Sequence, residues 1–411
     1  MAVVKPFLCV RPETSVASKV AALPYDVYNR AEAKAEVERE PLSFLKIDRA
    51  ETGFPDEVDT YAPCVYERAR ELLYGMVANG IFVQEKVPCY YVYELTMDER
   101  TQTGIVACSS IDDYAANVIK KHENTRAEKE EDRVRHVETC DAQTGPIFLA
   151  YRSRADINAV VAEAKTEPPL YDFTAIDGIR HMAWRISKKE QVKTLEEAFA
   201  QVPETYIADG HHRAASAVRV GFKRRGENSN HEGNEPYNYF LSVLFPDEEL
   251  MIMDYNRVVK DLNGLSEEAF LERIKKDFEV RTVGSEPVQP GKKGEFGMFL
   301  SDCWYLLTTK RIPCGDPVED LDVSVLQDTL LGPVLGIGDP RIDKRIDFIG
   351  GIRGLSELSR RCHTDMKVAF SMYPTSIEEL FQVADAGRLM PPKSTWFEPK
   401  LRSGLFIHKL S

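Results

Sequence analysis

Five consecutive residues, Asp209-Gly210-His211-His212-Arg213, carry the clearest chemical signal in the chain. Backbone N–H groups at the start of a helix, and the positive end of its dipole, attract anions. Gly210 permits a tight turn and a close approach of a ligand, and Arg213 can hold phosphate oxygens with its planar guanidinium. These residues predict a phosphate-binding turn in which the histidines donate hydrogen bonds or hold the turn. The alternative, histidines that only cap a helix, explains any one residue but explains all five less well.

The flanking residues indicate the elements that position this turn. Residues 205–208 have the pattern of a short apolar strand. Residues 214–218 then form an apolar stripe with helical spacing, and Gly221 is expected to end that helix. The turn is therefore expected at a strand-to-helix junction, at the start of the helix.

The pair His122-Glu123 is a candidate for acid–base chemistry. A serine hydroxyl is a weak nucleophile at neutral pH, so its attack on phosphorus benefits from a carboxylate within hydrogen-bond reach. A carboxylate beside bound phosphate also helps to hold a metal ion. The alternative is that Glu123 only precedes a solvated, highly charged helix over residues 125–137, and residue chemistry alone favours that alternative. Three charged residues of this helix are further candidates for the same pocket: Lys129, Asp132 and Arg133.

A third candidate is the loop that contains Lys393, Ser394 and Thr395. It follows a predicted helix over residues 376–386, which begins at a capping-box spacing and stops at Gly387. A lysine with two hydroxyl residues can contact a phosphate or a carboxylate. An ordinary surface loop with a solvated lysine explains the same residues equally well.

The three motifs together resemble those of the free serine kinases. Asp-Gly-His-His-Arg looks like the box of the ParB/sulfiredoxin-like superfamily, in which a strand and a helix flank a nucleotide phosphate site. The chain is also identified as a member of the domain-of-unknown-function family number one thousand and fifteen. That second resemblance covers nearly the whole chain, from Arg11-Pro12 and Leu23-Pro24-Tyr25-Asp26-Val27 to the tail.

The resemblance implies a role for each motif. It makes Glu123 the catalytic base, with His122 and Asp209 as further catalytic residues. The remaining residues of the box, Gly210, His211, His212 and Arg213, would bind the phosphates of ADP or ATP. The loop of Lys393, Ser394 and Thr395 would contact the substrate. Mg²⁺ is the expected companion ion, because phosphoryl transfer depends on positioning and electrostatics, but no set of metal ligands is assigned.

The expected fold class is α+β, with mixed α/β elements throughout. The resemblance implies a ParB/sulfiredoxin-like nucleotide-binding core over residues 107–260, an added N-terminal α/β region over 1–106 and a C-terminal α/β domain over 261–411. The N-terminal region has no counterpart in the kinases, and a longer segment with Thr144-Gly145-Pro146 precedes the box. A rebuilt substrate pocket is therefore expected. Asp26 is a candidate for it, although a turn-forming role is favoured.

The composition of the chain limits the classes of binding partner that we expect. With 53 basic and 66 acidic residues the formal charge is −13, which disfavours a nucleic-acid partner such as DNA. No apolar run reaches the length of a membrane span, and we expect neither a membrane partner nor a signal peptide. A cytoplasmic location with free thiols is expected, because the cysteines are scattered. They are Cys9, Cys64, Cys89, Cys108, Cys140, Cys303, Cys314 and Cys362.

These observations predict a nucleotide-dependent phosphotransferase that acts on a small hydroxyl metabolite, with free serine or phosphoserine as the leading candidate. The alternative is a nucleotide-binding switch or sensor without catalysis, as in ParB relatives. Glu123 discriminates between them, since a switch needs the phosphate box but no base. The nucleotide, the direction of transfer and a homodimeric state all stay open at this stage.

Overall fold

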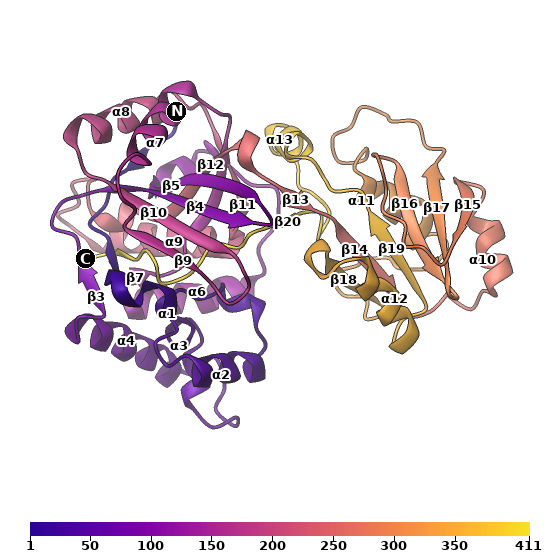
Figure 1. Cartoon of the computed structure of the whole chain (residues 1–411), viewed down its shortest axis with the longest axis horizontal. Helices are drawn as coiled ribbons and strands as arrows, with labels where there is room; N and C mark the ends of the chain where they lie inside the picture. The colour runs from indigo at the N-terminus through magenta and orange to yellow at the C-terminus, as the bar shows by residue number, and fades with distance from the viewer. The chain divides into compact units, whose positions relative to one another are not determined.

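The computed structural model describes all residues from Met1 to Ser411, which fall into two compact units. The first unit comprises residues 1–250 and 399–411, and the second comprises residues 251–398. Each unit has a sheet and an apolar core of its own (Figure 1). The expected mixed α/β class is thereby confirmed.

The first unit is built on a nine-stranded mixed sheet. Eight of its strands follow the order β6-β11-β8-β12-β5-β4-β10-β9, and the ninth, β1, pairs with β5. Runs of β-branched and aromatic residues such as Tyr90–Met97 favour buried strands. The strands are β1 Val4–Lys5, β4 Tyr90–Met97, β5 Arg100–Ser110, β6 Ile119–Lys120, β8 Ile147–Tyr151, β9 Tyr171–Thr174, β10 Arg180–Ile186, β11 Thr205–Asp209 and β12 Tyr239–Pro246.

Strand β4 shows that both faces of this sheet are covered. Tyr90 and Val92 lie in a core that also contains residues of three helices, α7, α8 and α9. Tyr91 and Tyr93 instead contact Phe406, with ring centroids 5.1 and 5.5 Å apart. Because successive side chains of a strand point to opposite faces, the helices and the C-terminal tail cover opposite faces of the sheet. The three helices are α7 Ala155–Ala164, α8 Lys189–Phe199 and α9 His211–Glu227.

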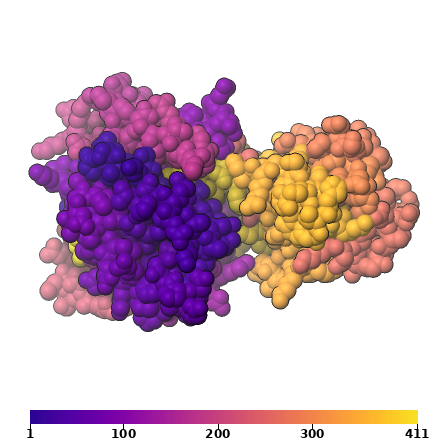
Figure 2. Space-filling model, turned by 60° about the horizontal axis from the view of Figure 1, so that its bottom comes forward, coloured from indigo at the N-terminus to yellow at the C-terminus, as the bar shows by residue number.

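A second core in this unit is formed mainly by the N-terminal helices, and Ile407 of the tail belongs to it. The N-terminal residues, indigo to violet in Figure 2, make up much of one face of the unit. The remaining elements of the unit are α1 Ala17–Val20, α2 Arg30–Arg39, α3 Leu45–Asp48, α4 Pro63–Ala78, α5 Ile111–Ala115, α6 Ala127–Cys140, β2 Val10–Pro12, β3 Phe82–Gln84, β7 Ala142–Gln143 and β21 His408–Lys409.

Helix α9 is longer than the sequence pattern predicts. It continues through Gly221 to Glu227, so the expected end at Gly221 is wrong. A Cβ atom at this glycine would lie 2.4 Å from the carbonyl oxygen of Tyr237 and 2.7 Å from Cδ1 of Ile111. Gly221 is therefore required for a close approach of two segments to the helix, and not as a helix stop.

The regions expected from the sequence divide the chain at other places than the compact units do. The boundary expected at residues 106–107 falls inside β5. This strand pairs with β1 and β4, which precede it in the sequence, and with β12, which follows it. The N-terminal region and the expected core therefore share one sheet. The last residues, 399–411, also return to the first unit, where β21 pairs with β7.

The second unit has a six-stranded sheet with the order β15-β17-β16-β19-β14-β18 and a separate strand pair, β13 with β20. Ser376 and Glu379 form the capping box expected at the start of α13. Its elements are β13 Ile252–Met253, β14 Tyr255–Val259, α10 Glu267–Ile274, β15 Phe278–Gly284, β16 Glu295–Leu300, β17 Cys303–Thr309, α11 Asp322–Leu326, β18 Ile346–Gly350, α12 Leu355–Thr364, β19 Val368–Met372, α13 Ile377–Asp385 and β20 Trp396–Phe397.

Two further expectations concern the chain as a whole. All eight cysteines are free thiols, as their scattered spacing predicts. None of the helices combines the length and the apolar character that crossing a bilayer requires.

Candidate functional site

The predicted phosphate-binding turn lies where expected, between β11 and α9. Gly210 is the N-cap residue of α9 and has φ 97° and ψ 31°, a left-handed conformation that favours glycine. No side chain caps the helix, which is 17 residues long and begins at His211. The turn thus presents the N-terminus of a long helix beside a backbone conformation that a larger residue adopts only with strain.

The same turn brings His122 and Glu123 to His211. Strand β6 runs parallel to β11, with Ile119 opposite Thr205. Chain segments that leave two adjacent parallel strands emerge at the same edge of the sheet, so residues 121–123 lie beside the turn. Oε2 of Glu123 is 4.0 Å from Nδ1 of His211, and the rings of His122 and His211 are perpendicular, with centroids 4.5 Å apart.

Both of these histidines are buried, whereas the side chain of Glu123 is 47% exposed. Burial lowers the pKa of His122 to about 4, although Asp209 opposes the shift. Burial also holds the pKa of His211 well below its usual value, and His122 adds to the effect. Both imidazoles are therefore neutral at pH 7. Two of their nitrogens, Nδ1 of His122 and Nε2 of His211, are buried without a hydrogen-bond partner.

Asp209 is held by two cations. Its Oδ2 atom lies 3.3 Å from Nζ of Lys400 and 3.7 Å from Nη2 of Arg213. Burial would raise the pKa of Asp209, but Lys400 and Arg213 outweigh it and hold the pKa well below its usual value. The carboxylate is therefore ionised at neutral pH. Lys400 was missed by sequence reasoning, because no local pattern links it to a residue 191 positions earlier.

Arg213 holds the turn to a neighbouring segment. Its Nη1 donates a hydrogen bond to the carbonyl oxygen of Pro146, the last residue of Thr144-Gly145-Pro146. A Cβ atom at Gly210 would lie 3.0 Å from Nη2 of Arg213, so the guanidinium packs directly on the glycine. Arg213 thus stabilises the turn in this structure, in addition to the phosphate contact that the sequence predicts for it.

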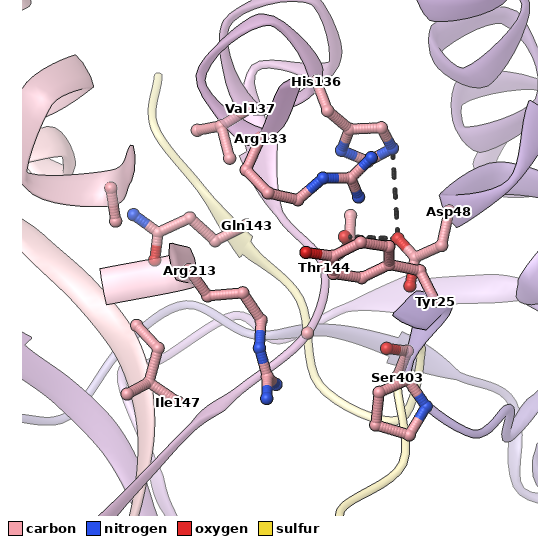
Figure 3. Close-up of a pocket in the computed structure, with 13 residues that line it drawn as sticks. Tyr25, Asp48, Arg133, His136, Val137, Gln143, Thr144, Ile147, Arg213 and Ser403 are labelled. Atoms are coloured by element: carbon pink, nitrogen blue, oxygen red, sulfur yellow. Dashed lines mark hydrogen bonds and ion pairs between the residues drawn. The ribbon is translucent and has the colours of Figure 1, made fainter. Parts of the chain in front are cut away.

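A small cavity lies beneath Arg213. Figure 3 shows Arg213 and Arg133 among its lining residues, together with Tyr25 and Thr144. Its volume is about 30 Å³, which is the space of roughly one water molecule. Asp48 at its wall accepts a hydrogen bond from Thr144, 2.8 Å long. This cavity is too small for a nucleotide or a metabolite.

A larger cavity of about 330 Å³ adjoins it on the side of the N-terminal helices. Asp26 of the Pro24-Tyr25-Asp26-Val27 segment lines it, and so do the three charged candidates of α6: Lys129, Asp132 and Arg133. Arg133 lies over the ring of Tyr25, 4.0 Å from the centroid, and pairs with Asp132. The N-terminal region thus contributes a charged wall to a cavity of the first unit.

His212 has a different environment from His211. Its Nε2 atom accepts a hydrogen bond of 2.9 Å from the backbone N–H of Arg126, the N-cap residue of α6. The turn is thereby connected to the loop of residues 121–126, which carries His122 and Glu123. His212 thus positions that loop relative to α9.

Comparison with known proteins places this site within a family. The family model described as "Protein of unknown function (DUF1015)" matches residues 4–324. The chain belongs to the DUF1015 family. The match includes the turn and His122-Glu123, but it ends before Lys393 and Lys400. No curated protein matches this DUF1015 chain.

Solved structures resemble this DUF1015 protein only distantly. A mutant free serine kinase in complex with ADP is 14% identical with a TM-score of 0.35, over 74% of this chain and 93% of that chain. SbnI with a C-terminal truncation, from Staphylococcus aureus, is 13% identical with a TM-score of 0.38, over 72% and 85%. A conserved hypothetical protein from Pyrococcus furiosus is 15% identical with a TM-score of 0.34, over 73% and 93%. Similarity at this level decides nothing about what a DUF1015 protein binds.

The predicted substrate loop belongs to the second unit of the DUF1015 chain. Lys393 has φ 61°, its carbonyl accepts a hydrogen bond from Arg257, and its Nζ lies 5.6 Å from the ring centroid of Tyr255. The hydroxyl of Ser394 donates to the carbonyl of Pro391, 2.6 Å away, so it holds the loop. The phosphate-binding turn lies in the first unit, so a contact of Lys393 or Thr395 with a ligand bound at the turn stays a prediction.

Proposed function

We propose that this DUF1015 protein binds the phosphates of ADP or ATP at the β11–α9 turn and transfers a phosphoryl group between the nucleotide and a small hydroxyl metabolite. Free serine or phosphoserine is the first candidate for that metabolite. One observation carries the proposal: the half-exposed carboxylate of Glu123 lies 4.0 Å from the first residue of the helix whose N-terminus forms the turn. The motif resemblance to free serine kinases supports the choice of reaction.

Each group at the turn has a part in the proposed step. In the direction of metabolite phosphorylation, the hydroxyl oxygen bonds to the terminal phosphorus of ATP, the bond to the bridging oxygen breaks and ADP leaves. Glu123 accepts the hydroxyl proton, for which its exposure suits it. His122 precedes it in the chain, and the charge of Asp209 acts on His122. Gly210, His211, His212 and Arg213 surround the phosphates.

The substrate loop completes the proposal. Because the hydroxyl of Ser394 is already bonded to Pro391, Lys393 and Thr395 are the residues of the loop that we expect to contact the metabolite or a phosphate. This part rests on the motif, since the loop belongs to the second unit. A test of Lys393 is therefore independent of a test of the turn.

Mg²⁺ is proposed as the ion that accompanies the nucleotide phosphates. It prefers oxygen ligands in an octahedral arrangement. Of the two carboxylates at the turn, Asp209 is engaged by Lys400 and Arg213, and Glu123 is flanked by two imidazoles. The residues around Glu123 therefore do not fit Mg²⁺, and its ligands would have to come from the nucleotide.

The direct test is to incubate the purified chain with serine and ATP, or with phosphoserine and ADP, and to measure phosphoserine. Glu123→Gln is expected to keep nucleotide affinity and to lower turnover by about 10²- to 10⁴-fold, the usual contribution of a general base. Arg213→Ala is expected to weaken nucleotide binding. Glu128→Gln, at a carboxylate in the first turn of α6, is the matched control and should change neither quantity.

Two outcomes would contradict the proposal. A fully active Glu123→Gln variant would remove the assigned base. Tight nucleotide binding with no turnover on any hydroxyl metabolite would instead support the alternative, a nucleotide-binding switch or sensor.

A further inference from the structure

We infer that His122, Glu123 and His211 form a binding site for a divalent transition-metal ion of the Zn²⁺ type. The three residues come from two segments, the loop after β6 and the first position of α9. Each offers one ligand atom, and these atoms all lie within 4.8 Å of one another. The inference deepens the proposed function, because it names an ion for the same site. Glu123 would hold the ion with one carboxylate oxygen, and its other oxygen would accept the hydroxyl proton.

The unused nitrogens of the two histidines are the first independent support. Nδ1 of His122 and Nε2 of His211 are buried and have no hydrogen-bond partner. Buried polar atoms in native proteins nearly always have a partner, and an orphan often marks an ion that belongs there. The remaining nitrogen of His211, Nδ1, is 4.0 Å from Glu123, which is beyond hydrogen-bond length. Either nitrogen of His211 is thus available to an ion.

The spacing of the side chains is the second support. The rings of His122 and His211 are perpendicular, with centroids 4.5 Å apart, and Oε2 of Glu123 is 4.0 Å from Nδ1 of His211. The three side chains are therefore already close to one another without an ion.

The chemistry of the ligands also suits a metal. Each histidine offers a ring nitrogen and Glu123 offers a carboxylate oxygen, and these are donor types that bind Zn²⁺. The carboxylate can neutralise part of the charge of a divalent cation.

The donor set selects the kind of ion. Two imidazole nitrogens and one carboxylate occur at catalytic Zn²⁺ sites, which leave a further position open, and at Fe²⁺ sites. Mg²⁺ is held mostly by oxygen. Ligand atoms around a tetrahedral Zn²⁺ are roughly 3.4 Å apart, so the side chains must close slightly from their present spread of up to 4.8 Å. Glu123 is half-exposed, and a rotation of its side chain can make that adjustment.

The test uses the full chain, stripped with a chelator and dialysed, and titrated separately with Zn²⁺, Co²⁺ and Mg²⁺. We expect one Zn²⁺ per chain by calorimetry and elemental analysis. Co²⁺ should give the visible absorption of a site of low coordination number, and millimolar Mg²⁺ should not displace it. A stoichiometry of zero, or Mg²⁺ binding equal to that of Zn²⁺, would overturn the inference.

Matched variants locate the ion. Glu123→Ala should weaken Zn²⁺ binding by at least about tenfold. This variant should fold like the wild type, because the side chain of Glu123 is half-exposed. His211→Gln should weaken binding as much, with a urea unfolding curve as the check on folding, since this residue is buried. His363→Gln is the control, because the exposed pair of His363 and Asp302, 2.5 Å apart, is the obvious place for adventitious Zn²⁺.

The result would count against the inference if Glu123→Ala bound Zn²⁺ like the wild type, or if His363→Gln abolished binding. Nucleotide binding is measured in parallel on the stripped protein with Mg²⁺ and ATP. Binding of ATP without a Zn²⁺ site overturns the inference alone. A Zn²⁺ site that needs Glu123, in a protein that binds no nucleotide, overturns the proposed function alone.

Discussion

At the scale of single residues, the site depends on a glycine that has two separate reasons to be there. The φ of 97° at Gly210 is costly for any residue with a Cβ atom. The absent side chain also leaves the space in which the guanidinium of Arg213 packs, within about 3 Å of where a Cβ would be. Gly210 thus permits both the turn and the position of the arginine that holds it.

Gly210→Ala should therefore destabilise the first unit and disturb the turn. We expect the free energy of unfolding to fall by about 1–3 kcal/mol, from the strained backbone and the displaced guanidinium, and nucleotide affinity to fall with it. Urea unfolding and calorimetry measure the two quantities. Gly226→Ala, in the same helix and with open space around it, is the control. It should be neutral or stabilise by up to about 1 kcal/mol, and equal effects of the two substitutions would refute this account.

At the scale of elements, local sequence patterns correctly predict the strands and helices whose formation depends on neighbouring residues. The apolar run Ile147–Tyr151 after Gly145-Pro146 predicts β8 as the structure has it, and the strand, turn and helix around Gly210 are also as predicted. The helix end predicted at Gly221 is wrong, because this glycine is needed for a close tertiary contact with Tyr237 and does not stop the helix. The pairing of the parallel strands β6 and β11, which brings Glu123 to His211, lies beyond local pattern because it joins residues about 86 positions apart.

The C-terminal tail is the other element that local pattern does not reveal. Residues 399–411 cross the first unit, and β21 pairs with β7 more than 260 positions earlier in the chain. The tail delivers Lys400 to Asp209. A long-range partner of this kind has no periodicity or spacing in the sequence that would predict it.

The contact of the tail with Asp209 has a pH dependence. Because the pKa of Asp209 is lower in the folded state than its usual value, the stabilisation is present above about pH 4 and is lost as the pH falls toward the folded-state pKa. Lys400→Met should raise that pKa and lower the free energy of unfolding at pH 7 by on the order of 1 kcal/mol, since solvent screens a carboxylate that is 35% exposed. Urea unfolding at pH 7 and pH 3 measures the difference.

The difference between Lys400→Met and the wild type should shrink on acidification below about pH 4, because the unfolded chain then takes up a proton at Asp209 while the folded wild type still holds the carboxylate ionised. Lys409→Met, at the other end of the tail in β21, is the control and should show no pH-dependent difference at this site. A difference for Lys400→Met that stays constant from pH 7 to pH 3 would mean that lost packing, and not charge, is the cause.

At the scale of the whole molecule, the two units differ in how the chain builds them. The second unit is one continuous segment, 251–398, and contains all six strands of its sheet. The first unit is interrupted, since the tail that completes it follows the entire second unit. The antiparallel pair β13 and β20, with Ile252 opposite Phe397, brings the two connecting segments side by side. The second unit is thus inserted into the first at a two-stranded connection.

This arrangement predicts unequal behaviour of fragments. Fragment 251–398 should unfold cooperatively in urea, with the buried Trp304 as a fluorescent reporter. Fragment 1–250 lacks five buried apolar side chains of the tail: Leu401, Leu405, Phe406, Ile407 and Leu410. At about 1.5–3 kcal/mol each, their loss is on the order of 10 kcal/mol, which is comparable to the entire stability of a typical domain. Fragment 1–250 should therefore fail to fold.

Joining residue 250 to residue 399 through a short Gly/Ser linker should restore the first unit, because neighbouring strands such as β13 and β20 are only about 4.8 Å apart. The linked protein contains the turn, Glu123 and Lys400 but not Lys393. If it folds and binds ATP without transferring phosphate, the turn is sufficient for the nucleotide and the second unit is required for the acceptor. If fragment 1–250 unfolds at the same urea concentration as the linked protein, the tail does not complete the first unit in the way that its burial indicates.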